Sequence, residues 1–283
     1  MAEIINGKIV SAKLREEIAA QVVDFKAKYG RVPGLAVIVV GDDPASAVYV
    51  RNKHKACLEV GITSYQIELP ADISERELIA KIDELNEDDS INGILVQLPL
   101  PKSIDEERII SRISPEKDVD AFHPANVGRI MIGNYKLLPC TPAGIIALMD
   151  HYGVEIAGKR CVVIGRSNIV GKPMSLLLTE RNGTVTLCHS RTHDIDKICL
   201  DADIIVVAVG RANFLTADMV KQGAVVIDVG INRLDNGKLC GDVAFEEVSK
   251  VASMITPVPG GVGPMTIATL LKNTLTAAEN QIK

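Results

Sequence analysis

The chain has 283 residues, a length that suits two ordinary domains, and 47% of them are hydrophobic, which is enough for sizeable cores. The formal net charge of −5 gives no electrostatic reason to expect binding to nucleic acid or to an anionic membrane. The longest apolar runs are strand-sized, so no segment is expected to span a membrane.

The cysteines and the N-terminus favour a cytoplasmic protein. The six cysteines show no C-x-x-C spacing and most fall in apolar segments, which is typical of reduced core residues. The first residues lack the charged-then-apolar order of a signal peptide. No metal site is expected, because His189 and His193 lie four residues apart without a third ligand at zinc-site spacing.

In the first half of the chain, apolar runs predict strands and capping signals predict the helices between them. The expected order is a strand at Leu35–Val40, a helix from Asp43-Pro44 to about Val60, a strand at Tyr65–Leu69, a helix from a capping box at Ser74–Glu77 to about Asn86, a strand at Gly93–Gln97, a helix capped at Ser103–Glu106, and a helix from Thr141-Pro142 to about Tyr152.

The second half continues the alternation of strands and helices. The expected elements are a strand ending at Ile164, strands at Thr184–Cys188, Ile204–Val209 and Ala224–Val229, a hairpin turn at Asp235-Asn236-Gly237, and a last helix at Met265–Glu279. The predicted fold class is therefore α/β, with two doubly wound domains, the second of Rossmann type, and a cleft between them. Ligands are expected at the carboxyl ends of the parallel strands.

A glycine-rich turn is the most informative motif. Gly165 ends a β-branched run and Gly171 opens a helical stretch, the arrangement in which backbone N–H groups and a helix N-terminus face a pyrophosphate. The turn departs from G-x-G-x-x-G, because Ser167 takes the middle position and Gly171 comes one residue late. A triphosphate-binding P-loop is excluded, since Lys172 is followed by Pro173. The alternative to a dinucleotide-binding turn is a pair of glycines placed only for steric reasons.

The residues after the next strand indicate which dinucleotide binds. NAD-binding folds place an acidic residue about 20 positions after the turn, where it binds the ribose 2′-hydroxyl. Here Ser190 and Arg191 stand at that place, and Arg166 lies inside the turn itself. A hydroxyl and two guanidinium groups suit a 2′-phosphate. Unless both arginines are ordinary solvated surface charges, the predicted cofactor is NADP.

Four polar side chains of the first half lie near predicted strand ends. Tyr49 and Lys53 are four residues apart on one helical face, Gln97 ends an apolar strand, and Asp120 follows the next helix. These side chains could converge at one end of one sheet, although an exposed Tyr–Lys pair is the simpler interpretation. The Tyr-x-x-x-Lys pattern also occurs in short-chain dehydrogenases, but there it follows the nucleotide-binding turn, whereas here it precedes that turn.

Taken together, the motifs resemble those of the bifunctional methylenetetrahydrofolate dehydrogenase/cyclohydrolases. The matching segments follow the family's order over nearly the whole chain: Tyr49–Lys53, Val96–Pro101, Pro115–Asp120, Pro139–Gly144, Gly165–Pro173, Cys188–Thr192, Asp228–Asn232 and Pro257–Thr266. One position departs from the pattern, because the family usually has glycine where this chain has Ala121. If φ is positive there, alanine is strained; if glycine only leaves room, a methyl group shifts the pterin slightly.

The resemblance implies an enzyme that transfers a hydride from 5,10-methylenetetrahydrofolate to NADP and then hydrolyses the methenyl product to 10-formyltetrahydrofolate. By position, Lys53 would be the acid/base residue with Gln97 bonded to it, Tyr49 would stack on the folate, and Asp120 would hold the pterin. The glycine-rich segment around Pro259, Gly260 and Gly263 would approach the folate and the nicotinamide closely. Contacts to NADP would come from Gly165, Arg166, Ser167, Ser190, Arg191 and Ile231.

The resemblance also implies domain boundaries and an assembly. Residues 1–139 plus 266–283 would form the folate-binding catalytic domain, and residues 140–265 the NADP-binding Rossmann domain. A homodimer through the nucleotide domains is expected, because the hairpin near Asn236-Gly237 leaves a strand edge exposed. Two other interpretations stay open: another two-domain dehydrogenase, of shikimate or amino-acid type, and a non-catalytic protein that binds NADP or folate.

Overall fold

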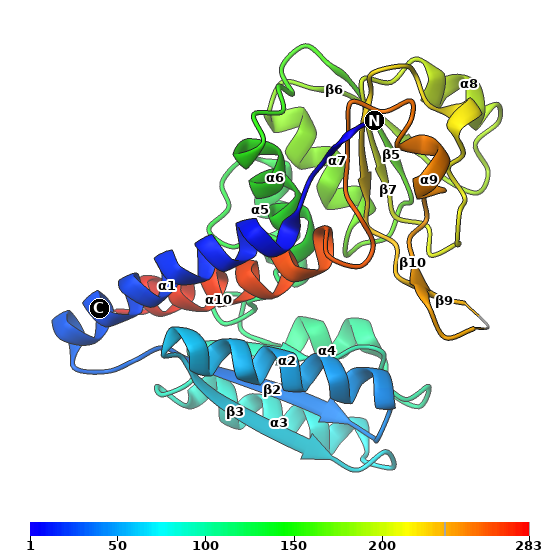
Figure 1. Cartoon of the computed structure of the whole chain (residues 1–283). Coiled ribbons are helices and arrows are strands. Elements are labelled where there is room, and N and C mark those ends of the chain that lie inside the picture. The colour runs from blue at the N-terminus through cyan, green and yellow to red at the C-terminus, as the bar shows by residue number, and fades with distance from the viewer. Residues whose placement is uncertain (235, 283) are drawn as a thin grey trace. The chain divides into compact units, whose positions relative to one another are not determined.

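The computed structural model describes residues 1–234 and 236–282, and the chain divides into two compact units. The three-stranded unit comprises Ala12–Cys140 and Ile267–Lys283, and the six-stranded unit comprises Met1–Ser11 and Thr141–Thr266. Each is built from helices on a parallel sheet (Figure 1), which confirms the predicted α/β class. Residues 1–11, expected in the folate domain, belong to the six-stranded unit, because β1 (Glu3–Ile4) pairs in parallel with β11 (Met254–Ile255).

The three-stranded unit is organised around β2 (Gly34–Val40), which lies between β3 (Thr63–Leu69) and β4 (Gly93–Val96). Side chains of β2 alternate between two apolar cores. Leu35 and Val37 pack in the core that α1 and α10 complete, whereas Ile38 packs in the core that α3 and α4 complete. Both faces of the sheet are therefore covered. The helices that contribute residues to this unit are α1 (Gly7–Tyr29), α2 (Pro44–Val60), α3 (Glu75–Glu87), α4 (Glu106–Arg112), α5 (Pro124–Met131) and α10 (Val262–Asn280).

Some helix starts follow the predicted signals: α2 begins at Pro44 and α3 after Ser74, whereas α6 begins at Cys140 and α10 at Val262, earlier than predicted. The hydroxyl of Ser74 accepts the backbone N–H of Glu77, whose carboxylate accepts the N–H of Ser74, so the capping box of α3 is confirmed. The predicted cap of α4 was wrong. Asp105 caps that helix by accepting the backbone N–H groups of Glu107 and Arg108, since a carboxylate also interacts favourably with the helix dipole.

The six-stranded sheet has the order β1-β11-β8-β7-β5-β6, and every neighbouring pair is parallel. Its other strands are β5 (Arg160–Ile164), β6 (Thr184–Cys188), β7 (Ile204–Val207) and β8 (Val225–Asp228). Its helices are α6 (Cys140–His151), α7 (Gly171–Glu180), α8 (Ile195–Leu200), α9 (Phe245–Val248) and the 3-10 turn η1 (Ala217–Met219). The central strands β5 and β7 are buried almost throughout, as a sheet covered on both faces requires.

An antiparallel hairpin of β9 (Asn232–Arg233) and β10 (Leu239–Cys240) extends from the six-stranded unit (Figure 1). Gly237 has the positive φ of +78° that the predicted turn requires. Asp235, the first residue of the predicted turn, lies outside the described residues.

The cysteines are free, and five of the six are buried. Burial raises the pKa of Cys161 to about 11 and that of Cys199 to about 12. Such thiols stay protonated and unreactive at neutral pH. In the part of the chain that the structure describes, no helix is both long enough and apolar enough to cross a membrane.

Candidate functional site

Lys53 and Gln97 meet at the carboxyl end of the three-stranded sheet. Lys53 lies on α2, the helix after β2, and Gln97 directly follows β4. Nζ of Lys53 donates a hydrogen bond of 3.0 Å to Oε1 of Gln97, and Nε2 of Gln97 donates one of 2.8 Å to the carbonyl of Leu98. The second bond fixes the amide so that its oxygen faces the ammonium group. Tyr49 lies one turn before Lys53 on the same helix and is 43% exposed.

Asp120 reaches the same end of the sheet through a segment that runs beside β4. The backbone N–H of Ile94 donates to the carbonyl of Lys117 at 2.7 Å, and Ile94 pairs in parallel with Asp118. Burial raises the pKa of the Asp120 carboxyl, and the Lys53 ammonium and the Cys140 thiol oppose that rise. The structure therefore brings Lys53, Gln97 and Asp120 together, as the sequence predicts.

The chain turns sharply on either side of Asp120. Asp118 is buried, and one of its oxygens, Oδ2, accepts the backbone N–H of His123 at 2.8 Å and the amide of Asn126 at 2.9 Å. Burial raises the pKa of Asp118 to about 6. The N–H of Ala121 donates to the carbonyl of Asp118, and Ala121 itself has φ of +56° with no exposed surface. Of the two possibilities raised by the glycine-to-alanine departure, the strained one is observed.

In the six-stranded unit, the turn between β5 and α7 has no room for side chains at two glycines. A Cβ on Gly165, whose φ is +119°, would lie 2.1 Å from the carbonyl oxygen of Ala208, and a Cβ on Gly171 would lie 2.0 Å from that of Gly165. The hydroxyl of Ser167 accepts the backbone N–H groups of Val170 and Gly171 at 3.1 and 3.3 Å. Ser167 therefore shapes the start of α7, and the bare turn leaves its backbone open to a ligand.

A cavity of about 440 Å³ opens beside this turn, at the carboxyl ends of β5 and β7. Gly165, Arg166 and Ser190 line it, so three predicted cofactor contacts come together there. Arg191 does not belong to its lining among the described residues. Arg211, which sequence reasoning missed, lines the cavity with its guanidinium 5.2 Å from the ring centroid of Phe214.

Two buried carboxylates hold the loops that follow β7 and β8. Asp242 joins the two loops by accepting four hydrogen bonds of 2.7 to 2.9 Å, from the backbone N–H groups of Val209, Gly210 and Arg211 and from the side-chain amide of Asn232. Asp228 accepts backbone N–H groups from Gly230, Asp242 and Val243. Asp228 ends β8, whereas Asp242 lies in a loop. The sequence did not predict the role of either aspartate, because a buried acid resembles a solvated one in the sequence.

The predicted glycine-rich segment is a tight loop at the start of α10. The Val258–Pro259 peptide bond is cis, and Gly260 has φ of +109°. A Cβ on Gly263 would lie 3.9 Å from Cδ1 of Ile231. The structure thus places Ile231, which is 49% exposed, next to the glycine-rich segment.

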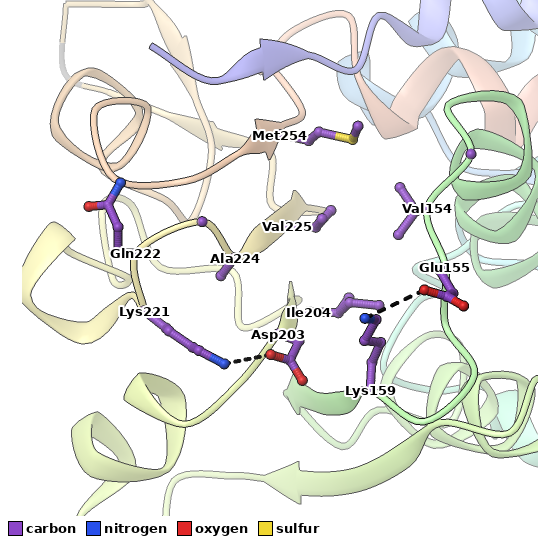
Figure 2. A pocket seen from close by; sticks show the side chains of 12 residues that line it. Val154, Glu155, Lys159, Asp203, Ile204, Lys221, Gln222, Ala224, Val225 and Met254 are labelled. Carbon is purple, nitrogen blue, oxygen red and sulfur yellow. Dashed lines mark hydrogen bonds and ion pairs between the residues drawn. The ribbon is translucent and has the colours of Figure 1, made fainter.

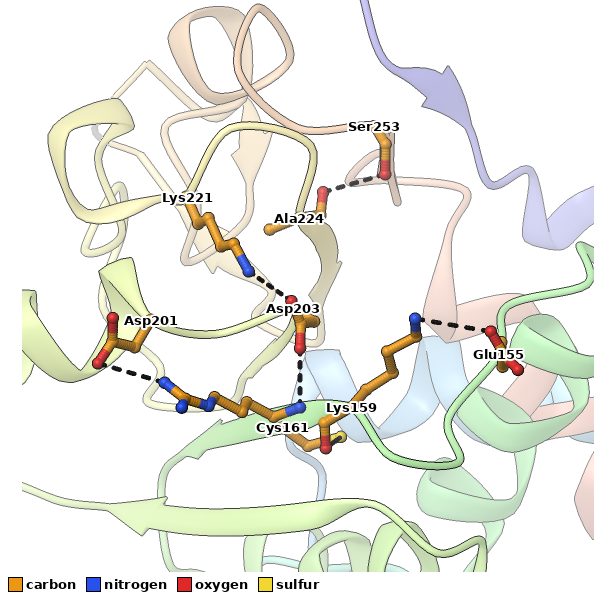
Figure 3. Close-up of polar contacts among 9 residues, drawn as sticks. Glu155, Lys159, Cys161, Asp201, Asp203, Lys221, Ala224 and Ser253 are labelled. Atoms are coloured by element: carbon orange, nitrogen blue, oxygen red, sulfur yellow. Dashed lines mark hydrogen bonds and ion pairs between the residues drawn. The ribbon is translucent and has the colours of Figure 1, made fainter.

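A second cavity, of about 350 Å³, lies at the amino ends of the strands of the six-stranded sheet, where β7 and β8 begin (Figure 2). Its two lysines are engaged in ion pairs: Lys221 with Asp203 at 2.6 Å, and Lys159 with Glu155 at 3.5 Å. Figure 3 shows the contact between Lys221 and Asp203. Asp203 also accepts the backbone N–H of Arg160 at 2.9 Å. Ligands of doubly wound sheets bind at the carboxyl ends of the strands, so the cavity beside Gly165 is the better candidate for a cofactor site.

Comparison with known proteins identifies the family. Residues 5–120 match the catalytic domain of tetrahydrofolate dehydrogenase/cyclohydrolase, and residues 139–282 match its NAD(P)-binding domain. The chain belongs to the tetrahydrofolate dehydrogenase/cyclohydrolase family. It is 61% identical over 282 residues to a bifunctional protein FolD of Acetivibrio thermocellus, covering 100% of this chain and 99% of that one.

Solved structures of the tetrahydrofolate dehydrogenase/cyclohydrolase family share the fold. The bifunctional enzyme FolD of Campylobacter jejuni is 51% identical with a TM-score of 0.98, and the alignment covers 100% of both chains. The Trypanosoma brucei enzyme, solved with NADP and an inhibitor, is 41% identical with a TM-score of 0.96, over 100% of this chain and 99% of that one. A shikimate 5-dehydrogenase from Thermus thermophilus shares 14% identity and a TM-score of 0.54, which shows a common fold alone.

Membership in this family decides between the interpretations left open by the sequence. The chain is an enzyme with methylenetetrahydrofolate dehydrogenase and methenyltetrahydrofolate cyclohydrolase activities, as predicted, and not a silent binding protein. The NAD(P)-binding domain and the NADP-bound relative confirm the predicted cofactor, NADP. The second domain is confirmed as a Rossmann-type domain.

Proposed function

We propose that Lys53, held by Gln97, carries the proton transfers of the cyclohydrolase step, and that Asp120 binds the pterin. The observation that supports this most strongly is the 3.0 Å bond from Nζ of Lys53 to Oε1 of Gln97 at the carboxyl end of the sheet, where the charge of Lys53 also acts on Asp120. Ligands of doubly wound domains bind at this end. The three residues therefore form the catalytic group of the three-stranded unit.

Each of these side chains has a distinct task in the two reactions. The Asp120 carboxylate accepts two N–H bonds from the amide and amino edge of the pterin, which orients the one-carbon bridge. Neutral Lys53 takes a proton from the water that attacks the methenyl carbon, and its ammonium form returns a proton to the ring nitrogen as the bridge opens. Gln97 keeps the amine directed at the bridge. The exposed ring of Tyr49 stacks on the folate.

The six-stranded unit fits NADP at the cavity beside Gly165. A side chain at Gly165 or Gly171 would collide with backbone, so this turn admits a pyrophosphate to its N–H groups only because both positions are bare. Arg166 and Ser190 hold the 2′-phosphate, with Arg191 as an outer charge. Ile231, Pro259, Gly260 and Gly263 contact the nicotinamide or the folate. When bound, NADP supplies the hydride acceptor for the dehydrogenase step.

One absorbance assay tests these residue roles. Purified protein receives 5,10-methylenetetrahydrofolate and NADP, while NADPH and the methenyl band are followed together. Wild-type protein should form NADPH with little accumulation of the methenyl compound. Asp120→Ala should slow NADPH formation and methenyl hydrolysis alike, because both steps need the same bound pterin. Loss of only one activity in Asp120→Ala would contradict the proposed role of Asp120.

The enzyme further acts, in our proposal, as a cytoplasmic homodimer. Strand β6 is one of the two edges of the six-stranded sheet, and its Thr184 and Thr186 side chains are exposed. Exposed edges of this kind are commonly paired with another chain. Light scattering should report twice the 30.4 kDa of a single chain at micromolar concentrations. A mass of one chain across that range contradicts the dimer.

A further inference from the structure

Asn273 is a polar side chain buried in an apolar environment. It lies on α10, is 7% exposed, and has the core residues Leu270, Leu271 and Leu275 as neighbours on the same helix. An amide in such a position is unfavourable by a few kcal/mol unless its hydrogens find acceptors. Its hydrogen-bond partners therefore indicate what the residue does.

Among the described residues, the side-chain partners of Asn273 lie on the two segments that surround Asp120. Nδ2 donates to the carbonyl of Val119 and to that of Leu138, each at 2.8 Å, and lies 3.7 Å from Sγ of Cys140. A primary amide has two N–H groups, so the two carbonyls use both. Val119 precedes Asp120 directly in the chain. One side chain thus joins two loop segments that are 19 residues apart, and it reaches both from a helix more than 130 residues further along the chain.

The second of these segments also influences Asp120. The Cys140 thiol donates a hydrogen bond of 3.4 Å to the carbonyl of Val119, and it opposes the rise in the pKa of the Asp120 carboxyl. Burial keeps Cys140 protonated, because it raises the pKa of the thiol well above its usual value. The thiol therefore keeps the hydrogen that it donates to Val119. Asn273 fixes the backbone that precedes Asp120 and the segment that carries Cys140.

We propose that Asn273 is a positioning residue for the Asp120 carboxylate. Through the carbonyls of Val119 and Leu138 it sets the direction in which Asp120 faces the pterin, and so controls folate affinity without touching folate. This proposal rests on the proposed role of Asp120. The adjacent residue Thr274 gives a contrast, since its buried hydroxyl bonds only within its own helix, to the carbonyl of Leu270 at 2.8 Å, among the bonds described for it.

The test compares Asn273→Leu with Thr274→Val. Both substitutions replace a buried polar side chain on α10 with an apolar side chain of similar size. Asn273→Leu should raise the KM for 5,10-methylenetetrahydrofolate roughly tenfold, the equivalent of about one net hydrogen bond, and leave the KM for NADP unchanged. Thr274→Val should leave both KM values unchanged. Equal changes in the two variants would mean that Asn273 serves the core alone, and the proposal would fail.

A double mutant separates positioning from general destabilisation. In an Asp120→Asn background, Asn273→Leu should raise the folate KM no further, because the residue it positions has already lost its charge, while its effect on thermal unfolding should persist. A further tenfold rise in that background overturns the proposal. If Asn273→Leu does not fold, Asn273→Ala serves in both comparisons, since it leaves room for water beside the two carbonyls.

The folate KM of Asp120→Asn distinguishes failure of the proposed role of Asp120 from failure of the proposed role of Asn273. If Asp120→Asn leaves the folate KM unchanged, the proposed role of Asp120 fails and the role of Asn273 fails with it. If Asp120→Asn raises the folate KM but Asn273→Leu does not, the folate-binding role of Asp120 stands and only the positioning role is refuted.

Discussion

Asp242→Asn should destabilise the six-stranded unit and weaken NADP binding. Asp242 is fully buried, and each carboxylate oxygen accepts two hydrogen bonds, Oδ2 from Val209 and Gly210 and Oδ1 from Arg211 and Asn232. An asparagine keeps one oxygen and turns an NH₂ group toward the other two donors. Two charge-assisted bonds are lost, each contributing about 1.5 to 3 kcal/mol. Relief of repulsion with the nearby Asp228 carboxylate offsets part of this loss, so we expect about 3 kcal/mol.

Urea unfolding of the wild type and of Asp242→Asn, each with and without NADP, measures the loss of stability and of NADP affinity. A ligand that binds the folded state stabilises it according to its concentration and affinity, so the transition that NADP shifts reports on the unit that binds it. In Asp242→Asn this transition should move to lower urea, and more NADP should be needed to restore it, because the Val209–Arg211 loop lines the cofactor cavity.

Asp83→Asn is the matched control for this experiment. Asp83 also accepts two bonds, both from Arg112, but both side chains are largely exposed. Exposed ion pairs contribute at most about 1 kcal/mol. If Asp242→Asn lowers the free energy of unfolding no more than Asp83→Asn does, and NADP affinity is unchanged, the Asp242 carboxylate does not hold the two loops.

Three further predictions follow from the site. Arg166→Ala should reduce the preference for NADP over NAD by about tenfold or more, because Arg166 lines the cavity, and Arg191→Asp should reduce it less; equal efficiency with both cofactors in the wild type contradicts the assignment. Lys53→Met should lower cyclohydrolase turnover by roughly 10² or more while measurable dehydrogenase activity remains, so the methenyl band should grow; release of 10-formyl product at the wild-type rate would exclude Lys53 as the acid/base. Burial raises the pKa of Asp118 to about 6 in the folded state, above its value in the unfolded chain of about 4. Its contribution to the free energy of unfolding is therefore fully present below pH 4 and is lost as the pH rises through 6. Asp118→Asn keeps an oxygen that can accept the N–H groups of His123 and Asn126, and it should remove this part of the pH dependence. If the free energy of unfolding of wild type and Asp118→Asn changes with pH in parallel, the role of Asp118 is contradicted.

Much of the fold was predictable because long apolar strands and capping residues are local signals. β2 is a continuous apolar run buried on both faces, and the Ser74 capping box determines the start of α3. Elements with weaker local signals were missed. The two-residue strands β1 and β11 are too short for any periodicity, and pair only because the folded sheet brings them together. Helix α1 begins with a glycine, and exposed apolar residues such as Ile9 and Val23 obscure its buried stripe of Val10, Ile18, Val22 and Phe25.

The residues of the candidate site also fall into those that local sequence signals predict and those that they do not. Lys53 and Gln97 were predictable because polar residues at the carboxyl ends of parallel strands meet at one edge of the sheet. Asn273 and Asp242 were not, because their importance depends on burial and on partners distant in the sequence. In a sequence, an asparagine on a helix and an aspartate in a loop look like ordinary solvated residues. Only the backbone groups that they satisfy set them apart.

At Ala121 a local backbone preference opposes the packing of the surrounding core. In the left-handed region an alanine is about 1 to 2 kcal/mol less favourable than a glycine, and Ala121 has φ of +56° there. Its methyl group, however, is fully buried in the core that also contains Leu137 and Cys140. Burying one such group stabilises by about 0.8 kcal/mol, and a glycine would lose about 0.5 to 1 kcal/mol more chain entropy on folding.

These opposing contributions nearly cancel, which accounts for alanine at a position where glycine is usual in the family. Ala121→Gly should therefore change the free energy of unfolding by less than about 1 kcal/mol. Ala121→Val adds a β-branched side chain at a positive φ, where such residues are strongly disfavoured, and should destabilise by at least about 2 kcal/mol. It should also raise the folate KM, since the strain would displace Asp120. Urea unfolding of the two variants gives the comparison. If Ala121→Gly proves as damaging as Ala121→Val, the methyl group has a packing role larger than its area allows, and the balance argued from φ and burial is wrong.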